Sequence, residues 1–133
     1  MTTFYERIRG PDGAALLLAY GELLFDGQYE RDIEEGLMII LDYWGQEPQR
    51  QVPSLVGIAD IVTKTAIYEI KYLLNRQTIF HALGQVLLYR ACLCPDATPI
   101  LVGHILEDIT PFRKVLDRMG VQVQCWPHDF GLD

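Results

Sequence analysis

Three charged residues lie within two neighbouring apolar stretches of the sequence. Asp60 falls in Val56–Val62, and Glu69 and Lys71 fall in Ala66–Tyr72. Two carboxylates about 5 Å apart repel each other by roughly 3 kcal/mol at an effective dielectric constant near 20. A hard divalent cation removes this repulsion, because Mg²⁺ takes one or two carboxylates as ligands and keeps several waters. These residues predict a Mg²⁺ or Mn²⁺ site formed by Asp60 and Glu69, with an ammonium group beside it.

The two stretches form a predicted β-hairpin, whose turn decides which side chains meet. Side chains alternate between the two faces of a strand, so Glu69 and Lys71 share one face. If Lys64-Thr65 is a two-residue turn, paired positions sum to 129 and Asp60 lies opposite Glu69. Lys-Thr is poor turn chemistry, so a register shifted by one residue is the alternative.

The surrounding elements follow from apolar spacing and from turn residues. Glu30 to Gly45 reads as a helix with an apolar stripe, and Gln49–Leu55 reads as an edge strand because Pro53 cannot donate a ladder hydrogen bond. A helix is expected over Gln77–Ala91, followed by a buried strand over Pro99–Ile105. The next helix is expected to be capped by Thr110, with Pro111 at its first position and Gly120 at its end, and a strand over Val121–Trp126 follows it. Upstream, Phe4–Arg9 reads as a short strand and Ala14–Phe25 as a strand or a buried helix.

This order predicts an α/β fold with a mixed four- to five-stranded sheet flanked by helices, in the sequence αβββαβ followed by a C-terminal helix and strand. At 133 residues the chain has room for one domain. We divide that domain into an N-terminal extension (1–29), a core (30–105) and a C-terminal part (106–133).

The helix over Gln77–Ala91 carries polar residues as well as a packing side. Ile79, Leu83, Val86, Leu87 and Arg90 are expected to face the core. His81, Gln85 and Tyr89 recur every four residues, so they project from one face and can reach Lys71, a carboxylate or a substrate phosphate. The alternative for Tyr89 and His81 is that they complete the core with a polar tip. Arg76 is a candidate for a phosphate contact, although a solvated arginine is the commoner outcome.

Three segments together carry a family resemblance: Gly57-Ile58-Ala59-Asp60, then Glu69-Ile70-Lys71, then Gln85-Val86-Leu87-Leu88-Tyr89. They resemble the PD-(D/E)XK nuclease superfamily, and the Gln-x-x-x-Tyr element resembles its RecB-type branch. The resemblance covers roughly residues 30–105. Ala59 stands where the name of the motif has proline.

The resemblance implies a restriction endonuclease-like fold and metal-dependent hydrolysis of DNA phosphodiester bonds. Asp60, Glu69 and the backbone carbonyl of Ile70 would hold Mg²⁺ or Mn²⁺. Lys71 would orient or help to deprotonate the attacking water, and Gln85 would support the site. Family members often add a carboxylate from the first helix, as in Holliday-junction resolvases. Glu34 is favoured over Glu30 for this role, and the alternative is an acidic first turn that complements the helix dipole.

The charge balance sets limits on how such a protein meets DNA. Eighteen Asp and Glu against eleven Lys and Arg give a net charge of −7. This excludes coating of a polyphosphate by bulk attraction, so DNA binding is expected to be weak and metal-dependent. Three cysteines and three scattered histidines fit neither a disulfide framework nor a common zinc site. The absence of a long apolar run and of a signal peptide indicates a cytoplasmic protein without a membrane span.

Two other functions fit the same sequence. A catalytically silent member of the fold could act as a nucleic-acid- or protein-binding module, which the acidic balance favours. Alternatively, Ala14–Tyr20 could be an interface within a larger assembly, and a homodimer is expected in either case.

Overall fold

The computed structural model describes residues 30–131, and the expectations for Phe4–Arg9, Ala14–Phe25 and the interface at Ala14–Tyr20 lie outside these residues. The elements follow in the order α3 (Glu30–Tyr43), β1 (Gln49–Ser54), β2 (Gly57–Val62), β3 (Ala66–Leu73), α4 (Arg76–Leu93), β4 (Thr98–His104), α5 (Thr110–Arg118), β5 (Gln122–Cys125) and the short 3-10 helix η1 (His128–Phe130). Among the described helices, none has the length and apolar character needed to cross a membrane.

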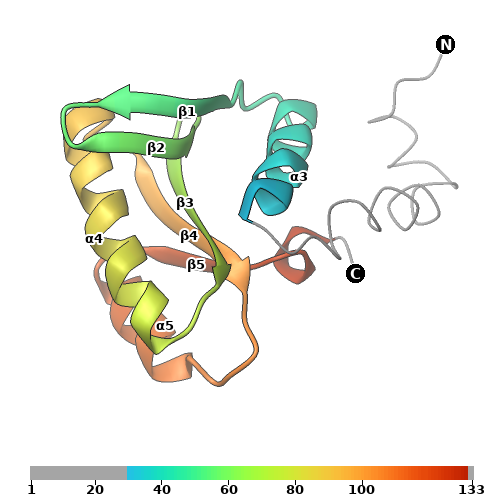
Figure 1. Cartoon of the computed structure of the whole chain (residues 1–133), viewed down its shortest axis with the longest axis vertical. Coiled ribbons are helices and arrows are strands. Elements are labelled where there is room, and N and C mark those ends of the chain that lie inside the picture. The colour runs from blue at the N-terminus through green and yellow to red at the C-terminus, as the bar shows by residue number, and fades with distance from the viewer. Residues whose placement is uncertain (1–29, 132–133) are drawn as a thin grey trace, which may run out of the picture.

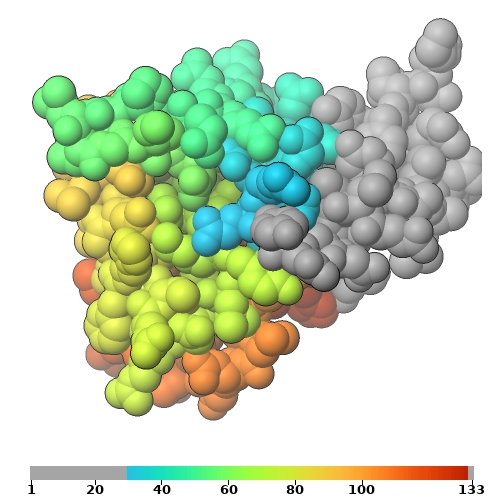
Figure 2. Space-filling view, viewed as in Figure 1, coloured from blue at the N-terminus to red at the C-terminus, as the bar shows by residue number. Residues whose placement is uncertain are grey.

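One five-stranded mixed sheet forms the centre of the described structure (Figure 1). The strands lie in the order β1-β2-β3-β4-β5; β1, β2 and β3 are antiparallel neighbours, whereas β3, β4 and β5 are parallel. Three helices flank this sheet, with α3 packed against β3 and β2 and α4 packed against β3 and β4 (Figure 1). Figure 2 shows α3 at the surface beside the strands of the first hairpin. The prediction of an α/β protein with a mixed sheet and with β1 at its edge is therefore confirmed.

The turn between β2 and β3 has the predicted register. Ile61 pairs with Tyr68 and Val62 with Ile67, so paired positions sum to 129. Thr63 makes this turn possible despite the poor turn chemistry of Lys64-Thr65. Its hydroxyl oxygen accepts hydrogen bonds from the backbone N–H groups of Thr65 and Ala66, which closes the loop with a side chain.

The sheet has an apolar core on each face. The core on the α3 side contains Ile33, Leu37, Leu41, Ile61, Tyr68, Ile70, Val102 and Trp126. The core on the α4 side contains Ile67, Ile79, Ala82, Val86, Tyr89, Leu101 and Leu116. Because Ile67 faces one core while Tyr68 and Ile70 face the other, the alternation expected for β3 is confirmed.

The buried side of α4 matches the predicted one in part, because Ile79 and Val86 are buried and Leu83 and Leu87 pack against the core. Its fully buried residues are Ile79, Ala82, Val86 and Tyr89, whereas Leu83, Leu87 and Arg90 are only partly buried. The opposite side is also apolar, with Phe80 65% and Leu88 56% exposed. A helix that is apolar on both sides has no clear amphipathic direction, so its spacing could not identify the face toward the sheet.

The start of α5 also differs slightly from expectation. Thr110 is already helical and Ile109 occupies the N-cap position, with no side-chain hydrogen bond from that residue. Instead, the Asp108 carboxylate accepts the backbone N–H of Thr110 at 2.9 Å. Pro111 lies in the first turn, as predicted.

Gly103 in β4 allows the backbone around Lys71 to come unusually close. A Cβ atom at this position would overlap the carbonyl oxygen of Lys71, which lies where the pairing of β3 with β4 shifts between Ile70 and Leu73. We expect Gly103→Ala to lower the free energy of unfolding by about 1–3 kcal/mol, because the backbone must move. Urea denaturation followed by circular dichroism measures this loss.

Gly84 supplies a matched control with the opposite sign. It lies in α4, and an added Cβ there meets no atom within 4 Å. Since alanine is favoured over glycine inside a helix by about 0.8–1 kcal/mol, Gly84→Ala should stabilise the protein. Equal effects of the two substitutions would contradict the close approach at Gly103.

The outer edge of β5 is capped by two side chains. The backbone N–H of Trp126 bonds back to Gly103 in β4, so by alternation Val123 and Cys125 direct their backbone groups outward. Arg113 donates to the carbonyl of Val123 at 2.9 Å, and Asp129 accepts the N–H of Cys125 at 2.7 Å. An ion pair of 3.3 Å joins Arg113 to Asp129.

Candidate functional site

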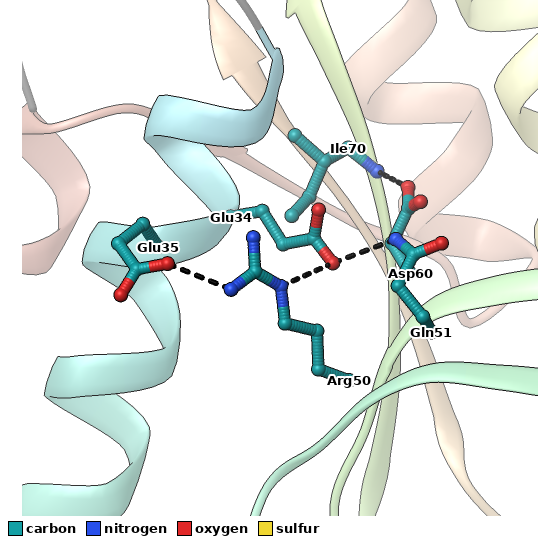
Figure 3. Close-up of polar contacts among 6 residues, drawn as sticks. All are labelled: Glu34, Glu35, Arg50, Gln51, Asp60 and Ile70. Carbon is teal, nitrogen blue, oxygen red and sulfur yellow. Dashed lines mark hydrogen bonds and ion pairs between the residues drawn. The ribbon is translucent and has the colours of Figure 1, made fainter.

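Asp60 lies where the ladder between β1 and β2 is interrupted and the ladder between β2 and β3 ends. Its neighbours Ala59 and Ile61 pair with β1, and Ile61 pairs with β3, but within the described sheet Asp60 itself is missing from both ladders. The side chain of Asp60 replaces a backbone carbonyl as the acceptor here. Asp60 Oδ2 accepts a hydrogen bond from the backbone N–H of Ile70 at 2.7 Å (Figure 3). The carboxylate is thereby fixed between β2 and β3.

Glu69 and Lys71 point into the same part of the structure, as the alternation predicted. Glu69 is buried, with 4% of its surface exposed, and its backbone pairs with Leu101 in β4. Lys71 Nζ lies 3.9 Å from Glu69 Oε1, which is an ion-pair distance but too long for a hydrogen bond. Glu69 Oε2 is buried without a hydrogen-bond partner among the described residues. A buried acceptor of this kind is available to a further ligand.

Burial raises the pKa values of both carboxyl groups, and the charges of neighbouring carboxylates act in the same direction. Desolvation is the largest cause for Glu69, followed by the charge of Asp60, and together they raise its pKa to about 9 despite the opposing charge of Lys71. Desolvation also raises the pKa of Asp60, and the charges of Glu34 and Glu30 act in the same direction. A hydrogen bond between the two side chains favours ionised Asp60 and protonated Glu69. With a pKa of about 9, Glu69 carries a proton near neutral pH when no metal is bound.

Glu34 reaches this region from α3. It is buried, with 7% of its surface exposed, and its Oε1 atom accepts two donors from β1 (Figure 3). Gln51 Nε2 lies 2.7 Å and Arg50 Nε lies 3.1 Å from that oxygen. Arg50 also contacts Glu35 through Nη1 at 2.7 Å, and the two carboxylates raise the pKa of the guanidinium group against the desolvation that lowers it. Asp60 and Glu34 are thus brought together, as the sequence predicted.

The sequence interpretation underestimated Glu30 and missed Arg50 and Gln51. The Glu30 carboxylate raises the pKa values of both Asp60 and Glu69, so it also acts on the site. The spacing of Glu30 and Glu34 by four residues did place both on one face of the helix. No pattern in β1 singled out Arg50 and Gln51, because polar residues are common in an edge strand.

The remaining predicted site residues on α4 lie in different surroundings. Gln85 Oε1 is buried without a hydrogen-bond partner among the described residues, which makes it a candidate for an additional contact. Tyr89 is buried in the α4-side core, and a Cβ atom at Gly57 would lie 2.8 Å from its hydroxyl oxygen. This agrees with the core role considered for Tyr89. His81 is exposed, and Arg76 lies at the start of α4 with its guanidinium group 5.9 Å from the centre of the Phe112 ring.

The donor set of the site is suited to a hard cation. No group of three or more His, Cys, Asp or Glu side chains that could hold a metal occurs within residues 30–131. The pair of Asp60 and Glu69 nevertheless supplies carboxylate oxygens, one of them buried and unpartnered. Mg²⁺ is commonly held by one or two carboxylates together with water, so a larger protein cluster is not required.

Comparison of the chain with protein-family models, with curated proteins and with solved structures found no match.

Proposed function

We propose that this protein is a metal-dependent nuclease that hydrolyses phosphodiester bonds in DNA. The observation that carries the proposal is the pair of the buried Glu69 and the half-buried Asp60, which lies where the ladder between β2 and β3 ends and has Lys71 beside it. Burying two carboxylates together is costly for the fold, and a role in binding a cation accounts for that cost. The resemblance of the three segments to the PD-(D/E)XK superfamily and to its restriction endonuclease-like fold supports the same proposal.

In this mechanism Asp60, Glu69 and the carbonyl of Ile70 hold Mg²⁺ or Mn²⁺. When bound, the ion lowers the pKa of water and neutralises charge on the phosphate. Lys71 orients the attacking water, and its ammonium group stabilises the negative charge that grows on the phosphate oxygens. Asp60 is kept in place for this task by the N–H of Ile70. Glu34 would hold a water or a second ion.

The net charge of −7 restricts how DNA is bound. Asp60, Glu69 and Glu34 account for three of the formal negative charges, and a divalent ion bound at the site offsets part of them. We therefore propose that the attraction between protein and DNA is local to the metal site and strongly dependent on the metal. A homodimer or a protein partner would add the contacts that a small acidic domain lacks.

Metal binding should stabilise the folded protein. With 10 mM Mg²⁺ and a dissociation constant near 1 mM, the free energy of unfolding is expected to rise by about 1.4 kcal/mol, because the ion binds only the folded state. Thermal melting with and without Mg²⁺ measures this effect. Asp42→Asn is the control, since Asp42 is exposed on α3 and should leave the shift unchanged.

Cleavage of single-stranded, duplex and branched DNA in the presence of Mn²⁺ identifies the substrate. Activity on any of them that disappears with EDTA supports the proposed nuclease. If Mn²⁺ neither stabilises the protein nor permits cleavage, the catalytically silent binding module is the correct function.

A further inference from the structure

The backbone of Gln51 has a conformation that is unusual for a β-strand. Its φ angle is +53°, in the left-handed region, although it lies in the middle of β1. Residues other than glycine, asparagine and aspartate rarely adopt this conformation, and it costs of order 1–3 kcal/mol. The neighbouring residues Arg50 and Val52 pair regularly with β2, so the irregularity is confined to one position.

That position is directly opposite Asp60. Arg50 pairs with Ile61 and Val52 with Ala59, which leaves Gln51 and Asp60 facing each other in the gap of the ladder. The left-handed residue is therefore located beside the carboxylate that the proposed mechanism uses. Strained residues of this kind tend to cluster at functional sites.

The left-handed conformation has a specific geometric effect on the side chains of β1. In a regular strand successive side chains point to opposite faces, so neighbours cannot meet at one atom. Arg50 Nε and Gln51 Nε2 nevertheless both contact Oε1 of Glu34, at 3.1 and 2.7 Å. The change of direction at Gln51 brings both donors to the same oxygen. The other oxygen of Glu34 takes part in neither contact and points toward Ile70 (Figure 3).

We infer that Gln51 is a positioning residue that holds Glu34 in its working orientation beside Asp60. The inference rests on the proposed nuclease function, which it extends by a residue of β1. The Gln51 amide acts through Glu34: together with Arg50 it occupies Oε1, which leaves Oε2 to the proposed metal site. The left-handed backbone at Gln51 allows the edge strand β1 to place this amide against Glu34.

Substitution of Gln51 by glycine removes the side-chain amide but still permits the left-handed backbone conformation. Glycine adopts φ +53° without strain, so Gln51→Gly should fold with an unchanged or higher melting temperature. Loss of the amide should raise the Mn²⁺ concentration needed for half-maximal cleavage by about tenfold, the lower end of the range for supporting contacts at metal sites. Calorimetric titration of Mn²⁺ should show the same weakening without DNA.

Two further variants complete the test. Gln49→Gly places a glycine elsewhere on β1, where it should lower the melting temperature and leave Mn²⁺ binding unchanged. Gln51→Val removes the amide and also disfavours the left-handed conformation, so it should lose both stability and Mn²⁺ affinity.

The possible outcomes distinguish this inference from the proposed function. If the wild-type protein binds Mn²⁺ and Gln51→Gly binds it equally well, the positioning role is wrong while the nuclease remains. A large drop in the melting temperature of Gln51→Gly with normal Mn²⁺ affinity assigns Gln51 a purely structural role and also overturns the inference. Failure of the wild-type protein to bind Mn²⁺ rejects the proposed function, and the positioning role with it.

Discussion

Replacing Glu69 by glutamine should abolish DNA cleavage and at the same time stabilise the metal-free protein. The substitution keeps the size of the side chain but removes a carboxylate ligand, so we expect the cleavage rate to fall on the order of 10³-fold. It also removes a buried carboxyl group whose pKa of about 9 means that it takes up a proton when the protein folds at neutral pH. The melting temperature without metal should therefore rise. Cleavage kinetics with Mn²⁺ and thermal melting in EDTA measure the two effects.

Variants of Asp60 and Lys71 provide the matched comparisons. Asp60→Asn can still accept the N–H of Ile70, whereas Asp60→Ala leaves this donor unpaired at a cost of about 1–3 kcal/mol. Both should be inactive, but only the alanine variant should lose stability. Lys71→Ala should likewise be inactive while it remains folded. Wild-type cleavage by any of these variants would show that the site is not catalytic.

The stability of the metal-free protein should fall as the pH rises from about 5 to about 9. The pKa of Glu69 is raised from 4.5 to about 9 in the folded state, so within this window the folded protein binds one more proton than the unfolded chain. Stability then decreases by up to about 1.4 kcal/mol per pH unit and levels off above pH 9. Urea denaturation at several pH values in EDTA tests the slope, which Glu69→Gln should largely remove.

The same proton couples metal binding to pH. A cation that binds Glu69 must displace the proton, so the apparent affinity for Mg²⁺ should rise up to tenfold per pH unit until about pH 9. Calorimetry in buffers with different ionisation enthalpies should show about one proton released at pH 7. An affinity that is constant between pH 6 and pH 8.5 would contradict the proton on Glu69.

Local rules in the sequence were sufficient to predict the hairpin and its register. Alternation in β3 placed Glu69 and Lys71 together, and the two-residue turn aligned β2 with β3. The side chain of Thr63 explains why this register holds although Lys64-Thr65 is unfavourable for the turn. These features depend on residues close in sequence, whose geometry is set by the period of the strand.

The features that the sequence did not reveal depend on contacts between distant segments. The left-handed conformation of Gln51 occurs opposite Asp60, and the Gln51 side chain contacts Glu34, seventeen residues earlier. The packing side of α4 was predicted only in part, because Phe80 and Leu88 make its outer side apolar as well. The raised pKa of Glu69 likewise depends on burial by other elements, which no pattern within β3 specifies.

Both edges of the described sheet are unfavourable for the addition of another strand. At the β5 edge, Arg113 and Asp129 already occupy a carbonyl and an N–H that an incoming strand would need. At the β1 edge, Gln51 departs from the extended conformation and Pro53 has no N–H to donate. Two copies would therefore not join into a continuous sheet across these edges. The same arrangement protects a chain rich in apolar strands from edge-to-edge aggregation at high concentration.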